Sequence, residues 1–557
     1  MRRELVTAVA GFAKPVVIKV SGEKRYLKLR RKGLRILSRF DRRRRQLVRR
    51  RSEQSGFAIR REVTRHGDLL NELVDELIPP HAAEQNFRLV VDALDDAGIE
   101  WWLVEDYSGH GYRIGVRTES KEQVGTALAT PGPGEPIYVK APQTGAVALA
   151  EAVRLCREPE VDIITVTAPK KVRNSNLAFG YRYGCTIEFW TSIVSDARVV
   201  IDAPAENRAA KLIAEEEFTL EPTTTESGIA CLTPRVLHRT MLEDITFPID
   251  AVYTWVDGAD PEWIESKRRL EAEIAGHEYH PEANHEARFE SKDELKYSLR
   301  SVEAFAPWFK TIYIVTSGQV PSWLDLDHPK IRLISHAEIY DDPNHLPTFN
   351  SNSIISRLHH IPGLSEHFIY LNDDVMFGKP VRPQDFFLPT GLSKVFPSRN
   401  HRPFGTATLE DGPHFNLTRN IRQLLEAEFG ITVTRAIKHT PYALLKSVQF
   451  EMEERFRAAF ERTWASRFRH HEDIVADQLY HYYSQIVGKA VATSITYRYI
   501  NIRDENYRWV MRETLRQRNR STLCLNDAPV EEVDPLSDDE VAAFLEAYFP
   551  WKSTFEI

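Results

Sequence analysis

The sequence is poor in cysteine, with four in 557 residues and no CxxC pair. This scarcity argues against a zinc finger or a disulfide scaffold and favours a reducing compartment. No apolar run approaches the ~18 residues that a membrane-spanning helix needs, which argues against an integral membrane protein. The chain also has neither GxxxxGK[ST] nor GxGxxG, so a P-loop kinase and a Rossmann dehydrogenase are disfavoured.

The length predicts two or three domains, because a single domain typically has about 150 residues. The predicted fold class is α/β, with a mostly parallel mixed sheet, a separate N-terminal α/β module and a helical C-terminal part. We expect four segments: a basic arm (1–60), an N-terminal module of unknown role (85–240), a catalytic domain (249–530) and a C-terminal tail (531–557).

Positive charge is concentrated near the N-terminus. Residues 24–51 contain 15 Lys or Arg and one acid, Asp41, whereas the whole chain has a net charge of −7. A basic amphipathic helix can bind the surface of an anionic membrane. Nucleic acid is the rival partner, which we do not expect, and a solvated arm that packs on the acidic body or on a second subunit is the plainest alternative.

Apolar, β-rich runs alternate with helical patterns in the second half of the chain. The predicted strands are residues 249–255, 310–316, 330–335 and 368–371. A helix with the apolar stripe Leu295, Leu299 and Val302 follows a capping box at Ser291–Glu294. This alternation predicts a mostly parallel sheet that is covered on both faces.

An acidic cluster follows the first and the last of these strands. Asp257 and Asp260 come after the first, and Asp373 and Asp374 come after the last. Ligands of such sheets bind beyond the carboxyl ends of the strands, where carboxylates suit Mg²⁺ or Mn²⁺. Either cluster alone reads better as plain turn residues, but two clusters in equivalent positions favour a metal site.

A third group contains histidine and arginine. His439 lies in the run KHTPY, and Arg469, His470 and His471 lie in the run RHHED. Histidine transfers protons near neutral pH, and arginine binds phosphate oxygens in a fork. The spacing matches no close zinc motif, and we expect a helix directly after Pro441.

At these residues the sequence resembles the Stealth family of sugar-1-phosphate transferases of bacterial capsule and exopolysaccharide synthesis. It is also similar to the catalytic subunit of the animal N-acetylglucosamine-1-phosphotransferase. The four conserved blocks of the family match residues 249–261 (IDAVYTWVDGADP), 288–387, about 435–473, and 524–527 (CLND). The second block, which begins RFESKDELKYSLRS, is the most specific, and residues 1–240 lie outside the resemblance.

The resemblance implies transfer of a hexose-1-phosphate from a nucleotide-sugar donor, with a UDP-sugar expected, to a hydroxyl of a glycan acceptor. The product is a phosphodiester, and UMP is released. The implied fold resembles a nucleotide-sugar glycosyltransferase (GT-A-like) core that uses a divalent cation. The alternatives are a metal-dependent glycosyltransferase that releases UDP and a non-catalytic subunit that binds a sugar nucleotide.

The resemblance and the clusters together assign roles to individual residues. Asp373 and Asp374 hold the metal, and His439 is favoured over Asp260 as the base that accepts the proton of the acceptor hydroxyl. The expected catalytic residues are Asp260, His439, Arg469 and His470. The expected donor-binding residues are Trp255, Asp257, Gly258, Lys292, Arg300, Asn350 and Asn372.

The expected location is the cytoplasm, at the inner face of the membrane if the basic arm binds lipid. The first 20 residues lack a long apolar segment before a cleavage site, so no cleaved signal peptide is expected. The oligomeric state stays open, and the N-terminal module is a natural place for a homodimer contact.

Overall fold

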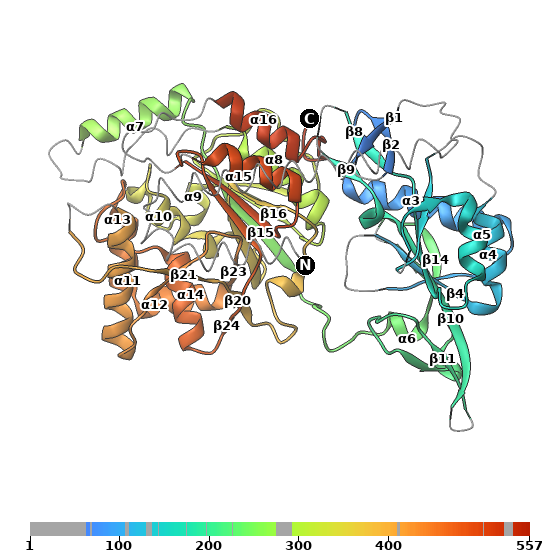
Figure 1. Cartoon of the computed structure of the whole chain (residues 1–557). Helices are drawn as coiled ribbons and strands as arrows, with labels where there is room; N and C mark the ends of the chain where they lie inside the picture. Colours follow the sequence, from blue (N-terminus) through green and yellow to red (C-terminus); the bar gives the residue numbers. More distant parts are fainter. Residues whose placement is uncertain are drawn as a thin grey trace, which may run out of the picture.

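The computed structural model describes residues 63–557 apart from internal gaps, of which the longest are 106–110, 130–135, 274–291, 409–412 and 528–537. The basic arm at 24–51 lies outside the described residues, so its contact with a membrane stays a prediction. Figure 1 shows two units side by side, joined by the segment before residue 249. Within the described part of the chain, no helix is long and apolar enough to cross a membrane.

The N-terminal unit is a sheet with helices packed against it. Its strands are β3 (Trp102–Leu103), β4 (Arg113–Arg117), β5 (Tyr138–Lys140), β6 (Val147–Ala148), β7 (Ile163–Thr167), β10 (Cys185–Ser195), β11 (Arg198–Asp202) and β12 (Leu212–Ala214). Its main helices are α3 (Pro79–Asp96), α4 (Lys121–Leu128) and α5 (Ala152–Arg157). Phe87, Val90 and Leu94 recur at helical spacing on α3 and are buried in the same core as Ile187 of β10.

The N-terminal unit begins earlier than residue 85, where we predicted its start. Pro79 occupies the first turn of α3, and a small sheet is formed before and beside it by β1 (Val63–His66), β2 (Leu69–Val74), β8 (Lys170–Val172) and β9 (Ala178–Phe179). Val172 and Phe179 of this small sheet belong to the hydrophobic core of the catalytic unit. The small sheet therefore attaches the N-terminal unit to the rest of the chain.

The catalytic unit is built on a five-stranded sheet of order β17-β16-β15-β18-β23. The strands are β15 (Ile249–Thr254), β16 (Ile312–Thr316), β17 (Ile331–Ser335), β18 (His367–Asn372) and β23 (Tyr442–Leu445). The first four are parallel, as predicted, and β23 runs antiparallel to β18. The chain passes from β15 outward to β16 and β17 and then returns to the other side of β15 as β18.

This connection creates a topological switch point between β15 and β18. Thr254, at the end of β15, lies opposite Asn372, at the end of β18. Parallel α/β sheets bind ligands in the crevice beyond the carboxyl ends of the strands at such a point. The two predicted acidic clusters therefore meet at one edge of the sheet.

Burial explains why these segments are strands. Every residue of β16 is buried, as are the first five residues of β15, which is expected for parallel strands covered on both faces. Figure 1 shows α8 (Glu294–Phe305) and α16 (Asp538–Tyr548) above this sheet and α12 (Lys446–Arg455) and α14 (Ala476–Ile486) below it. The hydroxyl groups of Tyr253 and Ser298 lie 2.8 Å apart and join β15 to α8 inside the core.

One sequence prediction in this unit is corrected. The helix expected after Pro441 is instead β23, because a short buried apolar run has the same pattern in either element. The predicted capping box includes Ser291, which lies outside the described residues, and the residue directly before α8 is Asp293, with φ 63°. The Glu294 carboxylate accepts a hydrogen bond from the Lys292 backbone N–H at 2.6 Å.

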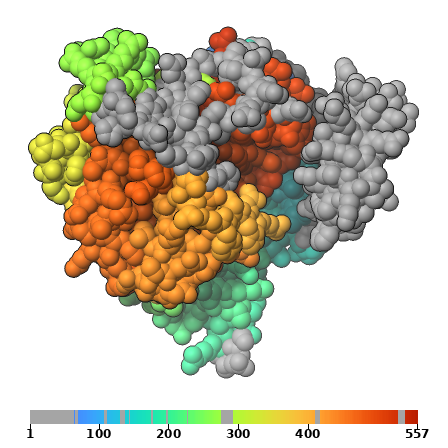
Figure 2. Space-filling model, turned by 90° about the vertical axis from the view of Figure 1, so that its left-hand side faces the viewer, coloured from blue at the N-terminus to red at the C-terminus, as the bar shows by residue number. Residues whose placement is uncertain are grey.

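The C-terminal part was predicted to be helical, but it contains strands as well as helices. After α12, α13 (Arg457–Ala465) and α14, the chain forms β24 (Ala490–Ala492), β25 (Tyr497–Asn501), α15 (Tyr507–Gln517) and β26 (Thr522–Asn526). Strand β26 pairs with β25 and with β19 (Val375–Phe377), which directly follows the second acidic cluster. Figure 2 shows this unit from the side of α7 (Pro261–Glu273) and of the orange helices that follow residue 413.

The predicted C-terminal tail is wrong for residues 538–557, which pack in the core. Leu545, Phe549 and Trp551 are almost completely buried. The guanidinium of Arg300 on α8 donates two hydrogen bonds of 2.9 Å to the two carboxylate oxygens of Glu556, and a third to the Phe549 carbonyl. Arg300 therefore holds the C-terminal segment against α8. We had predicted that this side chain contacts the donor, and the structure assigns it this structural role instead.

We expect Arg300→Ala to lower the free energy of unfolding by about 3 kcal/mol, because it leaves the buried Glu556 carboxylate unpaired. The side chains of Arg300 and Glu556 are 9% and 6% exposed. Denaturant unfolding followed by circular dichroism measures this change. Arg512→Ala on the exposed face of α15 is the matched control. An equal effect of both variants would contradict the anchoring role.

Candidate active site

His439 lies at the switch point, in the short connection that leads into β23. Its Nε2 atom is 3.3 Å from the Asn372 amide nitrogen and 3.6 Å from the Asp374 Oδ1 atom. Its Nδ1 atom is 3.3 Å from the Tyr442 hydroxyl. A neutral imidazole with its proton on Nδ1 satisfies both contacts, since Nε2 then accepts from the Asn372 amide. Nε2 is therefore the nitrogen available to take a proton.

The electrostatic surroundings of His439 favour its charged form. Burial alone would lower the pKa of His439, but the nearby Asp374 carboxylate and the negative charge of Asp477 outweigh it. The pKa of His439 therefore lies above its ordinary value of 6.5. The side chains of His439 and Asp374 are 30% and 19% exposed, so a substrate can reach both.

Three carboxylates crowd the end of β18. Desolvation and the negative charges of Glu294 and Asp374 raise the pKa of Asp373 well above its usual range. Burial raises the pKa of Glu294 to about 7, with a contribution from the charge of Asp374. Such mutual repulsion is relieved by a bound cation or proton. Glu294 thus belongs to this acidic group, although the sequence pattern had predicted only a helix-capping role for it.

Asp374 has an acceptor atom that the described residues leave without a hydrogen bond. Its Oδ1 atom is buried without a hydrogen-bond partner, and its Oδ2 atom accepts from the Cys524 thiol at 3.3 Å. A buried carboxylate oxygen is costly unless it is paired or coordinates a metal. The Asp374, His439 and Cys524 ligand atoms all lie within 4.8 Å of one another. The predicted metal residues Asp373 and Asp374 therefore lie where a cation would be stabilised.

Asp477 is a buried acid that senses the charges of both His439 and Arg469. Burial raises the pKa of Asp477 to about 6, and the positive charges of His439 and Arg469 act against this rise. The Arg469 guanidinium also donates to the Ser351 hydroxyl at 2.5 Å. The charge of Arg469 thus acts on Asp477, as does that of His439, and its role toward the phosphoryl group stays a prediction. Asp477 was missed because a single acid in an aromatic helix carries no sequence signal.

The loop before α14 is held against α10 (Ser351–Ile355) by Asn350. The Asn350 side-chain amide donates to Asp473 Oδ2 and to the Ser466 carbonyl, both at 2.8 Å, and its oxygen caps the helix. The backbone N–H of His470 donates to the same Asp473 oxygen at 2.9 Å. Asn350 is fully buried, so the structure replaces its predicted donor contact with a positioning role for this loop.

Asp257 and Asp260 form a second group at the end of β15. The Gln319 side chain, from the loop after β16, donates to the Asp257 carbonyl and to Asp260 Oδ2, each at 2.8 Å. The hydrogen bond from Gln319 and that from the Glu262 backbone lower the pKa of Asp260. Trp255 and Gly258 are half-buried in the same turn. An Asp260 with a lowered pKa is a weak base, which favours His439 for proton transfer.

Lys292 lies between the acidic group and the C-terminal strands. Its Nζ atom is 3.1 Å from Asp527 Oδ2, and Arg503 pairs with the other oxygen of the same carboxylate. These contacts lower the pKa of Asp527. Lys292 lies just before α8, and its positive charge partly offsets the rise in the pKa of Glu294. Lys292 therefore already balances the charges of Asp527 and Glu294, and its predicted contact with the donor stays a prediction.

Comparison with known proteins identifies the family of this chain. Models of Stealth protein conserved regions 1, 2, 3 and 4 match residues 247–275, 288–395, 438–485 and 513–557. An exopolysaccharide phosphotransferase of Streptomyces coelicolor is 37% identical over 508 residues, which are 88% of this chain and 85% of the relative. The chain belongs to the Stealth family.

Other Stealth relatives carry the same functional name. A second exopolysaccharide phosphotransferase of Streptomyces coelicolor is 38% identical over 89% of this chain, which spans about half (53%) of that relative. The exopolysaccharide phosphotransferase CpsY of Mycobacterium leprae is 34% identical over 89% of this chain and 90% of the relative. These alignments extend well beyond residues 249–527, so the expectation that residues 1–240 lie outside the resemblance is corrected.

Two solved structures share some similarity with the chain. The galactosyltransferase LgtC, in complex with donor and acceptor sugar analogs, matches at a TM-score of 0.28 and 11% identity, covering 55% of this chain and 97% of LgtC. Mouse xyloside xylosyltransferase 1 matches at a TM-score of 0.25 and 10% identity, covering 51% of this chain and 99% of that enzyme.

The four Stealth regions meet at the site just described. Region 1 supplies Asp257 and Asp260, and region 2 supplies the carboxylates near β18. Region 3 begins at Lys438, next to His439, and region 4 contains Cys524. Region 4 also reaches the end of the chain, so it is longer than the four residues that the sequence had indicated. This extension agrees with the packing of the C-terminal segment.

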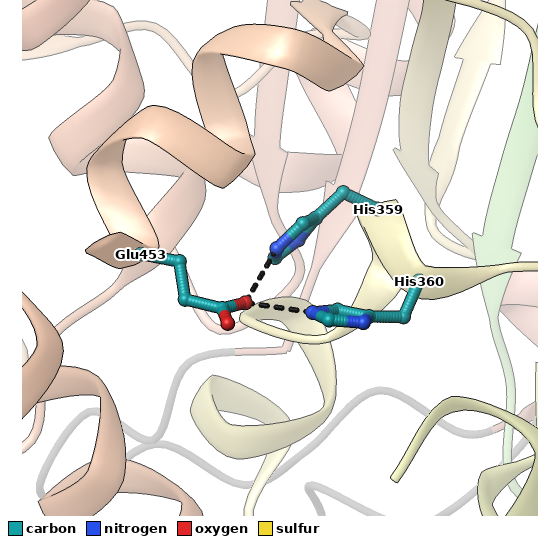
Figure 3. A group of neighbouring side chains, drawn as sticks. All are labelled: His359, His360 and Glu453. Carbon is teal, nitrogen blue, oxygen red and sulfur yellow. Dashed lines mark hydrogen bonds and ion pairs between the residues drawn. The ribbon is translucent and has the colours of Figure 1, made fainter. Parts of the chain in front are cut away.

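A second cluster of ligand-type side chains lies away from this site. Figure 3 shows His359 and His360, from a turn at Leu358–His360, and Glu453, from α12. The Nε2 atoms of both histidines lie 2.7 Å from the same Glu453 oxygen. Hydrogen bonds from both imidazoles lower the pKa of Glu453 against the effect of burial, and burial lowers the pKa of His359 to about 4.

These contacts indicate a structural network of hydrogen bonds and ion pairs around Glu453 rather than a metal site. The other Glu453 oxygen pairs with Arg457 at 3.0 Å, and Arg357 lies 3.8 Å from the shared oxygen. Two guanidinium groups repel a divalent cation, and the shared oxygen already accepts from both imidazoles. Glu453 thus joins α12 to the turn before β18.

We expect Glu453→Ala to lower the free energy of unfolding by about 3 kcal/mol, because it leaves two histidines and two arginines without their shared acceptor. Urea unfolding at pH 7 measures the change. Glu454→Ala, at the exposed neighbouring position, is the control and should alter stability by less than about 0.5 kcal/mol. Similar losses of stability in both variants would contradict the structural role of the Glu453 network.

Proposed function

We propose that the chain transfers a hexose-1-phosphate from a nucleotide-sugar donor to a hydroxyl of a glycan acceptor during exopolysaccharide synthesis. With a UDP-sugar as donor, the products are a phosphodiester and UMP. The convergence of His439 and Asp374 at the switch point carries this proposal, since it joins a proton acceptor to a carboxylate group suited to a diphosphate-bound cation. The functional name of the relatives supports phosphoryl transfer rather than sugar transfer.

Asp373 and Asp374 would hold Mg²⁺ or Mn²⁺, with Glu294 beside them. Hard cations prefer carboxylate oxygens, and the unsatisfied Asp374 Oδ1 atom and the crowding of the three acids fit such an ion. Zinc held by Asp374, His439 and Cys524 fits less well, because Cys524 would bind it as the thiolate, whereas burial raises the pKa of this thiol well above its usual value. When bound, the cation would neutralise the donor diphosphate and the developing charge of the leaving nucleotide.

His439 would take the proton of the acceptor hydroxyl on Nε2. The acceptor oxygen then forms a bond to the β-phosphorus of the donor. The bond between that phosphorus and the bridging oxygen breaks, and the nucleoside monophosphate leaves with the electron pair. Asn372 would orient the imidazole through its 3.3 Å contact with Nε2. Phosphoryl transfer depends mainly on such positioning and on charge neutralisation.

Arg469 would neutralise the transferred phosphoryl group, and Asp477 would hold it near His439. Arginine suits this role because its fork matches phosphate oxygens. Asp257 and Asp260, linked by Gln319, would bind the donor at the end of β15, with Trp255 beside its base or sugar. His470 would assist from the loop that Asp473 orders.

The first test is identification of the released nucleotide. Purified protein is incubated with UDP-glucose or UDP-N-acetylglucosamine, an oligosaccharide acceptor and Mg²⁺, and the nucleotides are separated by ion-exchange chromatography. We expect UMP, whose formation stops when EDTA is added. UDP would instead establish attack at the anomeric carbon. Absence of either nucleotide, across several donors and acceptors, would favour a non-catalytic subunit.

The second test uses three variants of the site. We expect Asp374→Asn and His439→Ala to abolish turnover, because each removes a charge or base that no neighbour replaces. Arg469→Ala should lower kcat about 100- to 1,000-fold, the usual effect of removing one donor to a developing charge.

The matched controls for these three variants are Asp327→Asn, His238→Ala and Arg462→Ala, each at an exposed position. They should retain turnover. Circular dichroism and the thermal midpoint verify folding of every variant. Wild-type turnover by a folded site variant would exclude that residue from the mechanism.

A further inference from the structure

A pocket of about 740 Å³ lies beside the site, and its walls come from a different part of the fold than the donor-binding turns. It is formed by β21 (Pro397–His401), by β22 (Arg435–Ile437) and by the chain from 492 to 497 that enters β25. None of its lining residues comes from the loops after β15 and β16. The proposed mechanism uses no residue of this pocket.

The pocket is strongly cationic. Arg399, Arg435, Lys438 and Arg520 line it, and no lining residue is an acid. Within the described part of the chain, none of these four cations forms an ion pair with a carboxylate, and the Nε atom of Arg520 is buried without a hydrogen-bond partner. Burial and the charge of Arg399 lower the pKa of Lys438. Unpaired cations held this close together are stabilised by an anion that enters between them.

Strand β25 connects the pocket to the catalytic group. Tyr497 lines the pocket, and Tyr499 lies on the same face of the strand, about 6.6 Å further along. Tyr499 lies opposite Cys524 on β26, and its pKa is raised by burial and by the charges of Cys524 and Asp374. Lys438 also directly precedes His439. The pocket is thus lined by the residue that precedes His439 and by the strand that carries Tyr499 to the catalytic group.

The position of the pocket favours the acceptor over the donor. The donor-side residues Asp257 and Asp260 lie at the end of β15, whereas the pocket adjoins the side of the site formed by β25 and β26. A neutral glycan would gain nothing from four unpaired cations. A glycan that already carries a phosphodiester would place its negative charge among them, because arginine forks match phosphate oxygens.

We propose that this pocket binds a phosphodiester group of the acceptor, so that the preferred acceptor is a glycan that already carries the product of an earlier transfer. This inference rests on the proposed function, since it takes the phosphodiester product as the recognised group. It places the reaction after a step that installs the first sugar phosphate, and it makes successive transfers to the same chain favourable.

The test measures acceptor binding without donor, which separates it from the test of the reaction. The full-length protein is titrated by calorimetry with a synthetic oligosaccharide that contains one internal phosphodiester, and with a neutral oligosaccharide of equal length. We expect wild-type protein to bind the phosphodiester compound at least 10-fold more tightly. This preference should fall as the salt concentration rises.

Arg399→Gln and the double variant Arg399→Gln with Arg520→Gln should weaken binding of the phosphodiester compound about 10-fold and 100-fold. Neither should change the affinity for the neutral oligosaccharide or for the UDP-sugar. Arg512→Gln on exposed α15 is the control. Arg399 is exposed, so its variant should fold even if the double variant does not.

Equal binding of the two oligosaccharides by wild-type protein would overturn the proposal. A matching loss of UDP-sugar affinity in Arg399→Gln would also overturn it and assign the pocket to the donor. Release of UDP in the reaction assay, together with the expected binding preference, would overturn the proposed reaction but keep the anionic acceptor.

Discussion

The parallel pairing of β15 with β18 is the constraint on which the site depends. It brings the ends of two strands that are more than 100 residues apart in sequence to adjacent positions, with Thr254 opposite Asn372. Asp373 and Asp374, which follow β18, and Glu294 at the start of α8 then crowd together, and burial raises the pKa of Asp373 and of Glu294. Their repulsion disfavours three simultaneous charges, which is why the site needs either a cation or bound protons.

The C-terminal segment completes this arrangement. Strand β26 carries Cys524 to the Asp374 carboxylate, and Asp527 at its end receives both Lys292 and Arg503. Arg300 holds the last residues against the back of α8. Loss of the C-terminal contacts would therefore disturb the acidic group through α8, although most of that segment touches no proposed substrate.

Charge of both signs occurs near His439. Asp374 lies 3.6 Å from its Nε2 atom, and Lys438, its neighbour in the chain, lines the cationic pocket. In the proposed reaction, a cation-bound diphosphate suits the carboxylates and an anionic acceptor suits the pocket.

The parallel strands, the two acidic clusters and the resemblance to the Stealth family could all be predicted from the sequence alone. These are local features, because apolar runs and turn residues act over a few positions. The roles of Arg300 and Asn350 depend instead on tertiary contacts, because each side chain pairs with a residue more than 100 positions away and is not left free for the predicted donor contact. The tertiary structure also revealed Glu294, Asp477 and the cationic pocket, whose significance depends on charges brought together across distant segments. Electrostatic interactions depend on distance in space, and a single sequence specifies only distance along the chain.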